Sequence, residues 1–207
     1  VNLHGFNRLE RIEIPGAARF LTFSCLHRTR SFLSSFACQI AATELTQIVA
    51  RDEIEIHAWC IMPDHMHLLI TTKKATVTDF LRDFKSKVSL LISPDNPRGI
   101  WERGGGHDRT IYSCAEFREK LRYTHLNPIR AGLVQQDCDW AWTSWHECHG
   151  SPRSDMPRVT AMMQIDSWTR APNGNGDNAI PQPLIYSRPL TRCVLRPSQD
   201  AGPKGRV

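Results

Sequence analysis

The chain is organised around the stretch Trp59-Cys60-Ile61-Met62-Pro63-Asp64-His65-Met66-His67-Leu68-Leu69-Ile70. Pro63-Asp64 is typical of a tight turn, and it separates two apolar runs of strand length, which predicts a β-hairpin. Because side chains alternate between the faces of a strand, His65 and His67 point to one face and Met66 points to the other, into a core. The two imidazoles therefore form a clamp that can hold a metal ion or bind a phosphate.

The segments on either side of the hairpin predict an α+β fold. Strict alternation in its first strand places Ala58 and Cys60 on the same face as Ile54 and Ile56. Strands are expected over residues 19–26, 54–61, 65–71 and a short run ending at 113, and helices over 36–51, 76–93 and 114–126. The order strand, helix, strand, strand, helix, strand is typical of a ferredoxin-like antiparallel sheet with helices packed on one face.

The composition of the chain changes after Gly150. Most of the 13 prolines lie beyond this point, together with Asn-Gly-Asn-Gly at 173–176 and scattered arginines. Segments of this kind cannot bury enough apolar surface to order themselves. We therefore expect one domain over residues 1–149, with its core at about 17–146, and a poorly ordered, Pro/Gly-rich basic tail over 150–207.

Charge and cysteine usage restrict the classes of function. The chain has 26 Lys and Arg against 21 Asp and Glu, which permits a polyanionic partner. Its seven cysteines are dispersed and form no C-x-x-C pair, which argues against a disulfide framework or a cysteine zinc site. No apolar run approaches the length of about 18 to 20 residues that spans a bilayer, and the first residues have no apolar signal core. These features predict a cytoplasmic protein with no membrane association.

Tyr123 and Asn127 form a second pair of candidate residues. They are four residues apart at the end of the predicted helix 114–126, so they share a face. A tyrosine can act as a covalent nucleophile, and an asparagine carbonyl is a plausible ligand for Mg²⁺ or Mn²⁺. The structural alternative is that Tyr123 packs in the core and Asn127 caps the helix before Pro128.

These motifs carry a family resemblance. The chain contains, in order, Asp64-His-Met-His-Leu-Leu69, Trp101-Glu-Arg103 followed by Asp108-Arg109, Tyr123-Thr-His-Leu-Asn-Pro-Ile-Arg-Ala-Gly-Leu-Val134, and Trp142-Thr-Ser-Trp145. Over residues 19–145 it resembles the REP-associated tyrosine transposases, which are single-tyrosine members of the HUH nuclease superfamily. Two features depart from that pattern: the triple glycine at 104–106, and the tail beyond Gly150.

The resemblance implies a function and a set of site residues. The chain is expected to be a DNA transposase, a single-strand DNA endonuclease that cleaves and rejoins hairpin-associated sites through a 5′-phosphotyrosine. Tyr123 would be the nucleophile, and His65, His67 and Asn127 would hold Mg²⁺ or Mn²⁺. No nucleotide cofactor is required, because the phosphotyrosine stores the bond energy for rejoining.

The expected partner is single-stranded or hairpin DNA, which implies association with the nucleoid. Unpaired bases would stack on aromatic rings such as Trp101 or Tyr112. Contacts with phosphates are expected from Lys85, Lys87, Arg109, Arg118 and Arg122. The sequence leaves open whether the protein acts as a monomer or a homodimer.

The histidine pair is also compatible with three other functions. A decayed or domesticated transposase would bind hairpins without cutting them. A phosphoesterase with three alternating histidines would need a histidine at position 69, where the chain has Leu69. A zinc hydrolase would need a carboxylate beside the pair, and Asp64 would point to the opposite face if it lay on the strand.

Overall fold

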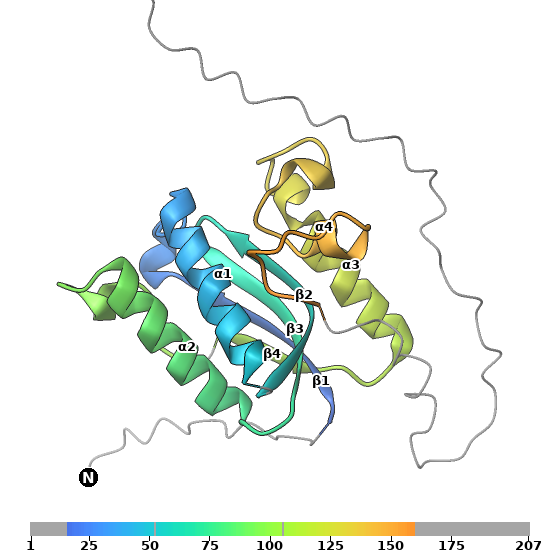
Figure 1. Ribbon diagram of the computed structural model, residues 1–207, viewed down its shortest axis with the longest axis horizontal. Helices are drawn as coiled ribbons and strands as arrows, with labels where there is room; N and C mark the ends of the chain where they lie inside the picture. The colour runs from blue at the N-terminus through green and yellow to red at the C-terminus, as the bar shows by residue number, and fades with distance from the viewer. Residues whose placement is uncertain (1–15, 52, 105, 160–207) are drawn as a thin grey trace, which may run out of the picture. The chain divides into compact units, whose positions relative to one another are not determined.

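The computed structural model describes residues 16–51, 53–104 and 106–159 (Figure 1). Short 3-10 turns occur at Leu26–Arg28, Pro97–Gly99 and Asp137–Asp139. The strands and α-helices are, in chain order, β1 Ala18–Ser24, α1 Ser35–Ala50, β2 Ile54–Met62, β3 His65–Thr72, α2 Val77–Ile92, β4 His107–Thr110, α3 Cys114–Arg130 and α4 Trp145–Cys148.

The four strands form one antiparallel sheet in the order β2-β3-β1-β4. This is the predicted ferredoxin-like α+β fold, with the predicted hairpin β2–β3 at one edge. In the register of the sheet, Thr22 on β1 lies opposite His67 on one side and His107 on the other. Ser24 lies opposite His65. The histidine pair is therefore close to the end of β1.

Apolar side chains cover both faces of the sheet. On one face, residues such as Phe23 and Leu68 pack against α1 and α2. On the other face, Phe20 and Leu69 pack against Phe117 of α3. The prediction that the helices pack on one face is correct for α1 and α2 and wrong for α3, because β1 and β3 carry bulky apolar residues on both faces.

The helix α3 is longer than predicted. Ser113 caps its first turn by accepting a hydrogen bond from the Glu116 backbone N–H at 3.1 Å. At the other end, Pro128 lies inside the helix, and the N–H of Ala131 still donates to the Asn127 carbonyl at 2.9 Å. Asn127 is thus a helical residue, and its alternative role as a cap is excluded.

A β-bulge changes the facing of β2. The pairing register with β3 shifts between Ile56 and Ala58, so Ile56 packs in the α1–α2 core while Ala58 packs under α3. Strict alternation was therefore the wrong prediction. After the bulge, Cys60 lies opposite His67 and Met62 lies opposite His65. The side chains of Cys60 and Met62 therefore share the face of the sheet that carries the histidine pair.

The packed part of the chain extends ten residues beyond the predicted boundary at 149. Met156 is buried, and the indole N–H of Trp59 donates to the Pro157 carbonyl at 3.3 Å. The remainder of the predicted tail, residues 160–207, lies outside the described residues. Among the helices that are described, none combines the length and apolar character needed to cross a bilayer.

Candidate active site

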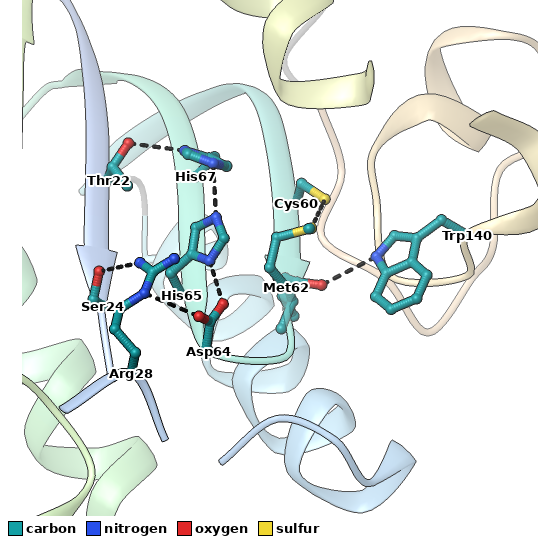
Figure 2. A network of polar contacts seen from close by, with 10 residues as sticks. Thr22, Ser24, Arg28, Cys60, Met62, Asp64, His65, His67 and Trp140 are labelled. Atoms are coloured by element: carbon teal, nitrogen blue, oxygen red, sulfur yellow. Dashed lines mark hydrogen bonds and ion pairs between the residues drawn. The ribbon is translucent and has the colours of Figure 1, made fainter. Parts of the chain in front are cut away.

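His65 and His67 point toward each other from β3 (Figure 2). Their Nε2 atoms are 3.0 Å apart, and the ring planes are nearly perpendicular, at 86°. Each Nδ1 atom has its own partner: Thr22 Oγ1 lies 2.8 Å from His67, and Asp64 Oδ1 lies 2.6 Å from His65. The two Nδ1 atoms are thus engaged with Thr22 and Asp64, and the two Nε2 atoms face each other.

Asp64 is part of the site, although the sequence analysis predicted that it would point away from the histidines if it lay on the strand. It lies in the turn before β3 and not on the strand, so the alternation rule does not apply, and its carboxylate reaches His65. The second carboxylate oxygen pairs with Arg28 Nε at 3.0 Å, and Arg28 Nη1 donates to Ser24 Oγ at 2.9 Å. Arg28 has a left-handed backbone, with φ of 58°. Such a conformation is uncommon outside glycine and tends to persist only where the surroundings impose it.

Tyr123 approaches the pair from α3. Its ring centroid is 5.4 Å from that of His67, in an edge-on arrangement at 86°. Phe20 of β1 supports both rings, since it stacks on His67 at 5.6 Å and contacts Tyr123 at 5.8 Å. The sheet and the helix on its far side are therefore both needed to bring the predicted nucleophile to the histidines.

Two cations that were not predicted from the sequence lie over the Tyr123 ring. The guanidinium carbon of Arg130 is 5.0 Å and the ammonium of Lys120 is 6.0 Å from the ring centroid. Lys120, Tyr123, Asn127 and Arg130 follow each other at intervals of three or four residues, so they form one stripe along α3. This spacing was available in the sequence and would have identified both cations.

Asn127 completes the candidate metal site. Its side chain is buried and hydrogen-bonds to His67. Within residues 16–51, 53–104 and 106–159, no third histidine, cysteine or carboxylate joins the pair to make a metal-binding group. The donor set is thus two imidazole nitrogens and one amide oxygen, a mixture that fits a divalent ion such as Mn²⁺ better than Mg²⁺, which prefers oxygen ligands.

The protonation state of His67 is also the one that a metal ligand requires. Burial, together with the neighbouring His65, lowers the pKa of His67 to about 3, while the hydrogen bond with Asn127 opposes this shift. His67 is therefore a neutral imidazole at ordinary pH, which is the form that binds metals.

The five cations predicted to contact DNA do not surround Tyr123. Lys85 and Lys87 belong to α2, on the opposite face of the sheet. Arg109 forms an ion pair with Glu116. Because successive helical residues are about 100° apart, Arg122 lies about 100° and Arg118 about 140° from Tyr123 around α3. The contacts of these five residues with DNA stay a prediction.

The two aromatic residues proposed to stack on bases differ in exposure. Trp101 is 7% exposed and packs against Phe23 and Phe32, with ring centroids 5.3 and 5.1 Å away. It belongs to the core, so its predicted role in stacking is wrong. Tyr112 is 75% exposed and stays available.

The chain is similar to known transposases. Residues 22–105 match the family model described as "Transposase IS200 like". A REP-associated tyrosine transposase of Escherichia coli (strain K12) is 26% identical over 137 residues, which cover 66% of this chain and 81% of the relative. This chain resembles the REP-associated tyrosine transposases. The resemblance predicted from the sequence is thereby confirmed, and the relatives support a DNA-processing enzyme of the transposase type.

A solved structure supports the fold. A REP-associated tyrosine transposase bound to a REP hairpin superimposes with a TM-score of 0.55 and 22% sequence identity, and the match covers 73% of this chain and 98% of the other. The similarity spans nearly the whole of that structure. The α+β architecture described above is therefore shared with a solved transposase.

Proposed function

We propose that this chain is a tyrosine transposase that cleaves and rejoins single-stranded DNA through a 5′-phosphotyrosine on Tyr123. The observation that carries the proposal is the convergence of three elements: the histidine pair of β3, Tyr123 of α3, and Phe20 of β1, which contacts both His67 and Tyr123. A nucleophile held beside a metal-binding pair is the arrangement that phosphodiester cleavage needs.

His65, His67 and Asn127 would hold the divalent ion through two Nε2 atoms and an amide oxygen. When bound, the ion would polarise a non-bridging oxygen of the scissile phosphate and neutralise charge in the transition state. Asp64 and Thr22 keep the two imidazoles oriented for this task from the Nδ1 side. The hydroxyl of Thr22 can donate or accept, so it suits either tautomer of His67.

In the proposed reaction the Tyr123 phenol attacks the phosphorus. The new bond joins Tyr123 Oη to phosphorus, and the bond from phosphorus to O3′ breaks. The phenol proton passes to solvent, and the departing O3′ takes up a proton from solvent, so the released strand ends in a 3′-hydroxyl. Lys120 and Arg130 stabilise the negative charge that develops at the reacting groups. The reverse attack by a 3′-hydroxyl rejoins the DNA, so no nucleotide cofactor is consumed.

The proposed substrate is a DNA hairpin with adjacent single-stranded sequence. The structural relative in complex with a REP hairpin supports this choice of partner. A folded hairpin offers a shape that the protein can select, whereas phosphate contacts alone carry no sequence information.

A covalent-adduct assay tests the proposal. The full chain is incubated with labelled hairpin DNA from the flanks of its own gene, in Mn²⁺, in Mg²⁺ and with a chelator, and the adduct is resolved on a denaturing gel. We expect a metal-dependent adduct that is absent in Tyr123→Phe and reduced in His65→Ala.

Binding of the same DNA is measured in parallel as the control. Tyr123→Phe removes one hydroxyl and leaves the ring on Phe20, so it should bind DNA as the native protein does. Tight hairpin binding by the native protein with no adduct in either metal would contradict the proposal and indicate a hairpin-binding protein without catalysis.

A further inference from the structure

A groove of about 400 Å³ lies on the α2 side of the sheet, away from Tyr123. We call it the α2 groove. It is lined by three cations, two serines, one indole and two apolar residues: Lys85, Arg98, Arg103, Ser86, Ser89, Trp101, Leu90 and Pro97. No carboxylate is among the lining residues, so the groove is positively charged and offers several hydrogen-bond donors.

The three cations of the α2 groove differ in their contacts. The ammonium of Lys85 donates to the Gly104 carbonyl at 3.3 Å and lies 5.8 Å from the Trp101 ring centroid. Arg98 and Arg103 are exposed, and no described residue forms an ion pair with either of them. The nearby Glu102 instead accepts a hydrogen bond from the His27 backbone N–H at 3.1 Å.

The groove and the candidate active site meet at one end of β1. Trp101 pairs with Cys25 in an antiparallel bridge, and the Glu102 N–H donates to the Ser24 carbonyl at 2.9 Å. Ser24 in turn lies opposite His65 in the sheet. Arg103 therefore follows directly on the residues that pair with the end of β1, where the groove and the histidine pair meet.

We infer that the α2 groove binds the phosphodiester backbone of the single strand that flanks the hairpin. This inference rests on the proposed function, because the strand reaches the groove only if the hairpin-proximal DNA occupies the site at Tyr123. Guanidinium groups and hydroxyls are the usual partners of phosphate oxygens, and one strand threading a basic groove needs no base-specific contacts. Trp101 forms the wall of the groove and does not stack, since it is almost fully buried.

Fluorescence anisotropy with two DNA probes tests the inference. One probe is the hairpin alone, and the other is the same hairpin with a single-stranded extension of about ten nucleotides, which is within the range of known single-strand sites. All proteins carry Tyr123→Phe so that binding is measured without cleavage. The test variant is Arg98→Gln/Arg103→Gln, and the matched control is Arg82→Gln/Arg153→Gln, which loses the same charge from exposed ion pairs outside the groove.

We expect the extension to raise affinity in the parent and control proteins, and this gain to be lost in the test variant. The slope of log affinity against log salt for the extended probe should become shallower by about 1.4, because each contact with a single strand contributes about 0.7. A companion variant, Arg98→Lys/Arg103→Lys, keeps the charge and should keep most of the gain.

Different outcomes separate the inference from the proposed function. If the test variant retains the gain from the extension, or if the control loses it equally, the inference is overturned and the proposed function stands. If the parent protein binds neither probe, the proposed function fails with it.

Discussion

The carboxylate of Asp64 lies 2.6 Å from Nδ1 of His65, in the turn that precedes β3. A carboxylate at this position accepts the Nδ1 hydrogen and leaves the Nε2 lone pair of His65 directed at His67. Such a partner fixes the tautomer and the ring orientation of a metal ligand. Arg28, paired with the other carboxylate oxygen, holds Asp64 in turn.

Asp64→Asn should weaken the binding of Mn²⁺ by about 10- to 100-fold, because the amide orients His65 less firmly than the carboxylate does. Isothermal titration calorimetry of the full chain with Mn²⁺ measures the effect without DNA. Asp95→Asn is the matched control, since Asp95 is exposed in the turn after α2. Equal affinity of the Asp64 and Asp95 variants would show that Asp64 does not position a metal ligand.

Arg130→Gln should slow formation of the covalent adduct by about 100-fold, because it removes a cation placed to stabilise charge beside Tyr123. Arg122→Gln makes the same change on the same helix, but at about 100° from Tyr123 around the axis. Single-turnover adduct formation at saturating DNA compares the two variants and separates the rate from binding. A comparable loss in both would point to a general effect of charge on α3.

The stability of the protein should fall in mild acid. His125 is 2% exposed, and burial lowers its pKa to about 3, with help from the nearby His149 and His146. Because an unfolded histidine has a pKa of about 6.5, the unfolded chain binds a proton between these values and the folded chain does not. The contribution is complete above pH 6.5 and decreases as the pH falls, by up to about 1.4 kcal/mol per pH unit.

Urea unfolding at pH 7.5 and pH 5.0 measures this dependence. The folded-state pKa values of His57 and His67, which burial lowers to about 4 and about 3, add to it in the same direction. His125→Gln removes one of the three groups and should reduce the loss of unfolding free energy by up to about 2 kcal/mol over this interval. An unchanged loss in His125→Gln would rule out His125 as a source of the acid sensitivity.

Gly106 should tolerate substitution less well than Gly104. Both have positive φ, 71° and 88°, so a side chain strains both backbones. A Cβ atom at Gly106 would lie 2.1 Å from the Thr22 carbonyl oxygen, whereas at Gly104 nothing lies within 4 Å. We expect Gly106→Ala to lower the free energy of unfolding by about 1–3 kcal/mol more than Gly104→Ala does.

Thermal or urea unfolding of the two alanine variants measures this difference. Thr22 lies between His67 and His107 in the sheet, so Gly106→Ala should also reduce Mn²⁺ affinity. Equal stability of the two variants would mean that β1 can shift away from the substituted residue.

Local patterns in the sequence predict the order of the elements and bring together the candidate site residues. Alternation in β3 placed His65 and His67 on one face, and helical spacing placed Tyr123 and Asn127 on another, because each of these relations depends only on residues a few positions apart. The same local rules would have found Lys120 and Arg130 on the stripe of Tyr123.

Several features of the fold and of the candidate site do not follow from local patterns. The bulge in β2 depends on pairing with β3, and the position of α3 depends on Phe20 and Leu69 offering a second apolar face. The contact of Asp64 with His65 depends on where the turn ends and the strand begins. Burial of Trp101 depends on Phe23 and Phe32, which are distant in the sequence. These features arise from packing between segments far apart in the chain, and no local periodicity encodes them.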